Sequence, residues 1–296
     1  MYPFAYGVAM WKVAIELARP KNVVIAAFTV PVGAHLAISG DWNYDVVGVV
    51  AIQTLSVVMF MAAGNTLNDV ADKSIDKIAK PHKPLPSGRI SPEQATRLAY
   101  MFIVASAILM GIAAYLISYP LVSIMIWFIA AVLMYTYDMG PKTKNYGLIG
   151  NIAISLMVGA VIIYGAAAVS LANNHIVLYV AGVAFFANLA REIVKDCEDM
   201  ETDEGRNTLP MRVGLEWSRA IAYLCVWCAL ILLYIPHWKG PYSLNELLYH
   251  TPAIVALASL NGPLFRGEDH RSQTQIRMGM ILGLISFAIL VVLEGQ

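Results

Sequence analysis

Charged side chains are scarce in this sequence. Asp, Glu, Lys and Arg make up only 14% of its 296 residues, whereas a soluble globular domain has about 25%. Hydrophobic residues make up 58%, and the mean hydropathy is +0.63. A soluble domain with this composition would lack charge for its surface, so we expect a membrane protein.

Cysteine is also scarce, with three residues in the chain. Cys225 and Cys228 form a C-x-x-C pair, but the pair lies inside a long apolar segment. Redox motifs use exposed, activated thiols. We therefore interpret this pair as packing within the membrane.

The hydrophobic residues gather into nine long runs. About 20 apolar residues span a hydrocarbon core of roughly 30 Å, and these runs are continuous, unlike the alternating strands of a barrel. We predict an all-α integral membrane bundle of nine transmembrane helices, forming one domain over residues 1–296. The first span is expected to start near Trp11 and to bend at Pro31. The predicted spans are Asn22–Ser39, Val46–Gly64, Leu98–Ser118, Tyr119–Tyr137, Leu148–Ala172, Ile176–Ala190, Trp217–Pro236, Leu244–Leu264 and Ile276–Leu293.

The connections between these runs differ in charge. If the N-terminus is cytoplasmic, the cytoplasmic connections carry many cations, among them Lys80, Lys142 and Arg271, whereas the opposite connections carry only Lys239. Because cytoplasmic loops are rich in Lys and Arg, we expect a multi-pass cell membrane protein with its N-terminus inside and its C-terminus outside. Most Asp and Glu residues also gather on the cytoplasmic side, which suggests a charged working surface there.

A row of amide and carboxylate side chains ends the second predicted span. If the helix continues, Asn68, Asp72 and Asp76 recur every four residues and share one face, with Asn65 on the same stripe. Such groups are costly at the end of an apolar helix unless they are neutralised. Their oxygens are ligands suited to Mg²⁺.

A second acidic row ends the sixth predicted span. Asp196, Asp199 and Asp203 recur at i, i+3 and i+7, which again places them on one helical face. Each row is followed by a basic loop containing Pro and Gly, at residues 80–89 and 205–210. The same arrangement therefore occurs twice on one predicted side of the membrane.

Two acidic rows with nearby cations suit the binding of a diphosphate. Mg²⁺ bridges carboxylates and phosphates, while Lys and Arg bind the remaining phosphate oxygens. Together they stabilise a departing diphosphate, so that an allylic C–O bond can break. Solvated charges at helix ends are the alternative, but two matched clusters favour a metal site. Neither cluster has the spacing of a calcium-binding EF-hand loop.

The two acidic rows resemble the paired motifs of the UbiA superfamily of intramembrane prenyltransferases. Asn68, Asp69, Asp72 and Asp76 match the first motif, and Asp196, Asp199 and Asp203 match the second. The resemblance implies nine helices around a central cavity, capped from the cytoplasm by loops at about residues 65–92 and 191–212. It also implies Mg²⁺ as cofactor and a prenyl diphosphate bound beneath the cap.

Segments 64–76, 191–196 and 208–210 are most similar to those of archaeal digeranylgeranylglyceryl phosphate synthases. This similarity implies transfer of a geranylgeranyl group to geranylgeranylglyceryl phosphate in ether-lipid biosynthesis. Aromatic or quinone-precursor prenyltransferases share the donor site and stay as an alternative. The expected partners are therefore a prenyl diphosphate, a lipid-like or aromatic acceptor and membrane lipid, with no nucleic acid.

Roles for individual residues follow from the motifs and the resemblance. Asn68, Asp72, Asp196 and Asp199 are expected to hold Mg²⁺, with Asp76 and Asp203 as secondary metal candidates. Asp72 and Asp196 are the main catalytic candidates, and Asp69 or a phosphate oxygen could accept the acceptor's proton. The predicted substrate-binding residues are Arg19, Asn22, Asn65, Lys83, Arg89, Tyr135, Tyr137, Lys142 and Lys144. For Arg19, Asn22, the two tyrosines and the last two lysines, interfacial anchoring is the alternative.

Other classes of membrane protein fit the pattern less well. A transporter places its sites near the midplane along a path open to both sides, whereas the outer half of each predicted span is nearly free of charge. A structural protein would not need acidic groups at one face. A phosphatidyl-type transferase also uses Asp and Mg²⁺, but it carries them in one segment.

Overall fold

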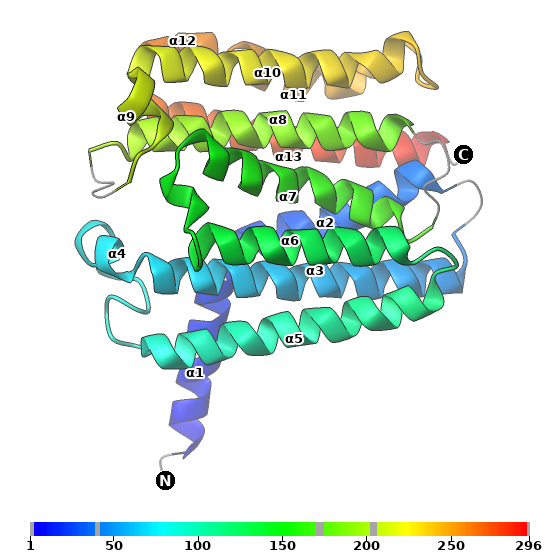
Figure 1. Cartoon of the computed structure of the whole chain (residues 1–296). Helices are drawn as coiled ribbons and strands as arrows, with labels where there is room; N and C mark the ends of the chain where they lie inside the picture. The colour runs from blue at the N-terminus through cyan, green and yellow to red at the C-terminus, as the bar shows by residue number, and fades with distance from the viewer. Residues whose placement is uncertain (1–2, 39–41, 170–174, 202–205, 295–296) are drawn as a thin grey trace.

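The computed structural model describes residues 3–38, 42–169, 175–201 and 206–294, and every regular element within these ranges is a helix. Figure 1 shows long, roughly parallel helices, with α1 set at a steep angle to them and short helices near their ends. The long helices are α1 (Pro3–Ala18), α2 (Pro20–Ala37), α3 (Tyr44–Ala71), α5 (Pro92–Leu116), α6 (Leu121–Asp138), α7 (Leu148–Ala166), α8 (His175–Glu198), α10 (Leu215–Trp238) and α13 (Asp269–Glu294). The short helices are α4 (Lys73–Ala79), η1 (Thr143–Asn145), α9 (Leu209–Val213), η2 (Glu246–His250), α11 (Thr251–Ala258) and α12 (Asn261–Phe265).

Seven helices are long and apolar enough to cross a membrane: α3, α5, α6, α7, α8, α10 and α13. Large apolar side chains lie exposed on them, such as Ile108, Phe128 and Leu224. In water these side chains would be unfavourable, but in lipid they are solvated. The chain is therefore an integral membrane protein, and the number of nine spans stays a prediction.

Two of the nine expected spans have a different form in the structure. The eighth is divided among η2, α11 and α12, because Pro252 and Pro263 each restrict the residue before them and favour a helix start. The first corresponds to α2, and the chain turns at Arg19, which has a left-handed backbone (φ 54°) between α1 and α2. Pro31 lies within α2, so the helix continues past this proline, and the bend expected there stays a prediction.

The bundle is held together where helices approach closely. A Cβ atom on Gly165 of α7 would lie 2.1 Å from the carbonyl oxygen of Val30 in α2, and one on Gly33 would lie 2.2 Å from that of Ile162. Only glycine at both positions allows this backbone contact. Because α7 also packs along α8, the α2–α7 contact joins the N-terminal helices to the C-terminal ones.

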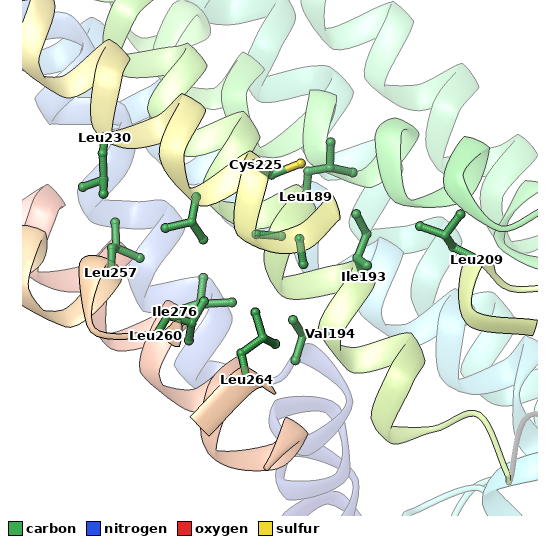
Figure 2. Close-up of a cluster of buried hydrophobic side chains, with 13 residues drawn as sticks. Leu189, Ile193, Val194, Leu209, Cys225, Leu230, Leu257, Leu260, Leu264 and Ile276 are labelled. Carbon is green, nitrogen blue, oxygen red and sulfur yellow. The ribbon is translucent and has the colours of Figure 1, made fainter. Parts of the chain in front are cut away.

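Helix α8 is amphipathic within the bundle. Its stripe of Leu189, Ile193 and Val194 points into an apolar cluster, shown in Figure 2, that includes Leu260 and Ile276. Helical geometry places the opposite stripe about half a turn away. That stripe contains Asn188, Arg191, Lys195 and Asp199, while Glu192 and Asp196 lie between it and the apolar stripe. Packing of the apolar stripe therefore directs the second acidic motif toward the other half of the bundle.

The two acidic motifs lie at the same end of the bundle. Figure 1 shows α4, α9 and the connection from α6 to α7 at one end, whereas the C-terminus lies at the other. We call the described segments that carry the two motifs at this end the polar cap; that they cover a central cavity from the cytoplasm stays a prediction.

Candidate active site

The first motif retains helical spacing across a break. Helix α3 ends at Ala71 and α4 begins at Lys73, with Asp72 between them. The amide of Asp72 still donates to the carbonyl of Asn68 at 2.9 Å, and that of Asp76 donates to Asp72 at 2.8 Å. The expected alignment of the motif therefore holds, although the helix is interrupted.

Two cations join three residues of the first motif. The ammonium of Lys83 lies 3.0 Å from Asp69 Oδ1 and 2.6 Å from Asp76 Oδ2. The guanidinium of Arg19 contacts Asp69 and donates to Asn68 Oδ1 at 2.9 Å. Both carboxylates are buried, so these cations offset their desolvation.

Asp72 holds two further cations. Its Oδ1 lies 2.7 Å from the ammonium of Lys144 and 2.9 Å from the guanidinium of Arg206. Burial alone would raise the pKa of the Asp72 carboxyl, but Lys144 and Arg206 outweigh burial and lower this pKa. Asp72 is therefore a carboxylate at neutral pH, as metal binding requires.

Two loops far apart in sequence deliver these cations. The amide of Asn207 donates to the carbonyl of Asn145 at 3.0 Å. A Cβ atom on Gly150 would lie 2.7 Å from Lys144 Cα, so the loop carrying Lys144 rests directly on the start of α7. This contact explains how residues of the second basic loop reach the first motif.

Asp138, at the end of α6, completes this cluster. Its Oδ1 accepts hydrogen bonds from Asn68 Nδ2 at 2.9 Å and from Lys144 Nζ at 3.0 Å. Because the Asn68 amide nitrogen is held by a carboxylate, its Oδ1 is turned toward Arg19 and away from Asp138. The sequence analysis assigned no role to Asp138 or Arg206. Their positions could have indicated a role, because Asp138 ends a predicted span and Arg206 lies in a basic loop, both on the same predicted side of the membrane as the motifs.

The second motif is supported by α7. Asp196 Oδ2 accepts a hydrogen bond from Asn151 Nδ2 at 2.9 Å. Asp199 follows the last turn of α8, where its amide donates to the Lys195 carbonyl. Asp203 lies outside the described residues.

Three charged side chains lie beside Asp196 on α8. Buried Glu192 contacts the guanidinium of Arg191, and its Oε2 lies 2.5 Å from Lys195 Nζ. Tyr137 of α6 is buried and lies near Glu192, Lys195, Asp138 and Asp196. Its position links the two motifs.

Several predicted residues do not join this cluster. Tyr135 is 57% exposed, on the other side of α6 from Tyr137. Lys142 is exposed and has a left-handed backbone. Arg89 is exposed and pairs with Glu16 of α1 at 2.6 Å. Asn22 is half-buried in the first turn of α2, and Asn65 donates to the carbonyl of Ala18 at 2.8 Å. Arg89 and Asn65 therefore hold the start of the chain against the cap.

The donor atoms of the two motifs fit Mg²⁺. They are carboxylate and amide oxygens, which hard cations prefer. Among the described residues, no three Asp, Glu, His or Cys side chains converge on one point. Lysine and arginine instead occupy the carboxylates, so a divalent ion would replace positive charge that is already present.

Two hollows are defined on the described part of the chain. One, of about 620 Å³, lies behind the second motif and includes Cys197, Glu198 and His270 in its lining. The other, of about 370 Å³, lies between α1 and α5. Neither is lined by a motif aspartate or asparagine, so the expected central chamber stays a prediction.

Comparison with known proteins gives a consistent result. The profile of the UbiA prenyltransferase family matches residues 26–284. A digeranylgeranylglyceryl phosphate synthase of Methanobrevibacter smithii is 35% identical, over 93% of this chain and 96% of the relative. One of Methanococcus aeolicus is 31% identical, over 94% of this chain and 97% of the relative.

Solved structures agree in fold. A structure concerning digeranylgeranylglyceryl phosphate synthase in membranes has a TM-score of 0.74 at 27% identity, covering 95% of this chain and 98% of that one. A UbiA homologue from Archaeoglobus fulgidus, bound to DMAPP and Mg²⁺, has a TM-score of 0.65 at 18% identity, covering 91% and 98%. With the paired acidic motifs at one end of a membrane bundle, these matches show that the chain belongs to the UbiA prenyltransferase family.

Proposed function

We propose that the chain transfers a geranylgeranyl group from geranylgeranyl diphosphate to the free hydroxyl of geranylgeranylglyceryl phosphate, releasing diphosphate. The observation that carries this proposal is full-length similarity to relatives named for this reaction, at 31% and 35% identity. The paired motifs supply the chemistry that the reaction needs. Its product would be an ether lipid with two isoprenoid chains.

The donor diphosphate would bind between the two motifs. Asn68, Asp72, Asp196 and Asp199 would hold Mg²⁺, with Asp76 and Asp203 as further candidates. When bound, Mg²⁺ neutralises the diphosphate and polarises its bridging oxygen. The residues of the chain would position this group and exclude water from the allylic carbon.

The cations of the site would then bind the diphosphate. Lys83, Lys144, Arg19 and Arg206 now contact motif side chains. With their carboxylates engaged by a metal ion, these ammonium and guanidinium groups would be available to bind the phosphate oxygens. They would stabilise the negative charge that develops as the C–O bond breaks. Asp69 or a phosphate oxygen would receive the proton from the acceptor hydroxyl.

We further propose nine membrane crossings, with the N-terminus and the polar cap in the cytoplasm and the C-terminus outside. The charge asymmetry of the connections supports this orientation. In support of the count, α2 and the segment from η2 to α12 lie where the first and eighth spans are expected. Cysteine labelling from each side of sealed vesicles, at single sites introduced in the 80–89 loop and near residue 239, tests this topology.

The reaction is tested with purified protein in detergent. The protein is given Mg²⁺ and geranylgeranyl diphosphate, together with geranylgeranylglyceryl phosphate or an aromatic acid, and products are identified by mass spectrometry. We expect a digeranylgeranyl product that disappears with EDTA and returns with excess Mg²⁺. Prenylation of the aromatic compound alone would overturn the proposed acceptor. Substrate movement across sealed vesicles without a product would favour transport.

A further inference from the structure

A triad of charged side chains on α8 lies outside the first-motif cluster. Glu192 binds Arg191 through Oε1 and Lys195 through Oε2, the latter at 2.5 Å. Only 3% of the Glu192 side chain is exposed, compared with 21% for Arg191 and 33% for Lys195. The carboxylate is thus enclosed while both cations stay accessible.

Charge in the triad depends on Asp196. In the first-motif cluster, the four carboxylates of Asp69, Asp72, Asp76 and Asp138 face the four cations Arg19, Lys83, Lys144 and Arg206. In the triad, two cations share the carboxylate of Glu192, and Asp196 is the further anion that acts on Lys195. If Asp196 held a metal ion, the two cations would exceed the one remaining carboxylate, and a bound anion would offset their charge.

Arg191 lies deeper in the bundle than the second motif. It precedes Asp196 by five residues, or about 7.5 Å along the helix axis, and α8 runs toward the polar cap. Lys195 directly precedes Asp196 and lies at the level of the motif. Arg19 lies close enough to Glu192, and Tyr137 close enough to Glu192 and Asp196, for electrostatic influence. The triad therefore lies near the point where the two motifs meet.

We propose that Arg191 and Lys195 bind the phosphomonoester of the lipid acceptor, an inference that rests on the proposed function. The free hydroxyl and the phosphate of this acceptor are on neighbouring glycerol carbons. When the hydroxyl faces the reacting carbon from the side away from the departing diphosphate, the acceptor phosphate lies deeper than the motifs. That is the level of Arg191, and Lys195 borders this level on the side of the motifs.

The side chains suit this ligand. The planar guanidinium of Arg191 can bind two phosphate oxygens at once, and its Nε is oriented by a hydrogen bond of 3.4 Å to Asn188 Oδ1. Asn188 donates in turn to Ser155 of α7 at 3.1 Å. Glu192 holds the guanidinium and the ammonium on either side of one carboxylate, which keeps two donors ready for the same anion.

The test compares two acceptors and two kinds of variant. Wild type, Arg191→Gln, Lys195→Gln and the conservative Arg191→Lys are assayed with geranylgeranylglyceryl phosphate and with its dephosphorylated form. The Michaelis constant of the donor is measured in parallel. Arg277→Gln, which removes an exposed cation of α13, serves as the matched control.

We expect Arg191→Gln and Lys195→Gln to raise the KM of the phosphorylated acceptor about 10- to 100-fold, the range for one charge-assisted hydrogen bond. The donor KM should stay within about twofold, and preference for the phosphorylated acceptor should fall by the same factor. Arg191→Lys should recover part of this preference, and Arg277→Gln should match wild type.

Four results would overturn the inference. A raised donor KM with an unchanged acceptor KM would assign the triad to the diphosphate. A lower kcat with unchanged preference between the two acceptors would indicate a structural role only. If wild type uses the phosphorylated acceptor but both Gln variants keep its full preference, the inference fails while the proposed function stands. If wild type gives no product with that acceptor, both fail.

Discussion

Replacing Asp138 with asparagine tests whether this buried carboxylate positions the first motif. Asp138 is 3% exposed, and one of its oxygens accepts hydrogen bonds from Asn68 at 2.9 Å and Lys144 at 3.0 Å. Asparagine has nearly the same size, so packing is preserved. The substitution removes the negative charge and lets the new amide turn its NH₂ toward Asn68, which would release the Asn68 side chain.

The magnitude follows from the contacts that are lost and kept. A hydrogen bond to a charged group contributes about 1.5–3 kcal/mol, which corresponds to about a 10- to 100-fold fall in kcat/KM. Breaking a buried ion pair costs about 3–5 kcal/mol when a charge is left alone. Lys144 keeps Asp72 at 2.7 Å, so the loss of folding stability should be smaller, about 1–2 kcal/mol.

The assay is Mg²⁺-dependent release of diphosphate by purified Asp138→Asn, with thermal unfolding recorded on the same sample. Asp45→Asn, at the opposite end of α3 and exposed, is the matched control and should behave as wild type. Activity of Asp138→Asn within twofold of wild type, with a normal melting temperature, would refute the positioning role.

Three further predictions concern charge, packing and pH. Lys83→Met removes the ammonium shared by Asp69 and Asp76, so the donor KM should rise at least about tenfold in steady-state assays, while Lys80→Met, in the same loop, should not change it. Gly165→Ala should lower stability by about 1–3 kcal/mol in thermal melts, because its Cβ would meet the Val30 carbonyl at 2.1 Å, whereas Gly111→Ala, with open space around it, should be neutral; equal melting temperatures would contradict the close contact. Because the Asp72 pKa is lowered in the folded protein, its stabilising effect is present above the unfolded pKa of about 3.9 and is lost as the pH falls through the folded value. The difference in melting temperature between wild type and Asp72→Asn should therefore be constant from about pH 5 to 8 and shrink in stronger acid, and a difference that vanished by pH 6 would be inconsistent with this pKa.

Local periodicity was sufficient to predict much of the site. Spacing of four residues aligned Asn68, Asp72 and Asp76, and the basic loop after them supplied Lys83, which does contact the motif. These features are encoded within one or two helical turns, so the sequence displays them directly. The long apolar runs likewise predicted the seven helices that meet the length and hydropathy of a membrane span.

Contacts between distant segments could not be predicted in this way. Arg206 reaches Asp72 across 134 positions, and Asp138 reaches Asn68 across 70. Each depends on how whole helices pack, for example on the loop that rests against Gly150.

Helix geometry alone could have shown that only one of the two tyrosines at the end of α6 faces the interior of the bundle. Tyr135 and Tyr137 are two residues apart, about 200° around a helix, so both could not face the interior. The structure buries Tyr137 and exposes Tyr135.

The residues of the eighth predicted span also indicate in part that it is divided into shorter helices. Pro252 and the Asn261-Gly262-Pro263 segment interrupt its apolar run. Proline removes a backbone donor and restricts its predecessor, so one continuous helix was unfavourable. The hydropathy of the segment outweighed this local signal in the prediction.

The central claim is that the two acidic motifs act together through Mg²⁺ on one diphosphate. The most direct measurement is product formation and diphosphate release by Asp72→Ala and Asp196→Ala, each reconstituted in lipid with geranylgeranyl diphosphate, geranylgeranylglyceryl phosphate and Mg²⁺. We expect both variants to fall to the background seen with EDTA while keeping a folded, monodisperse profile. Near wild-type activity in either variant would contradict a shared metal site.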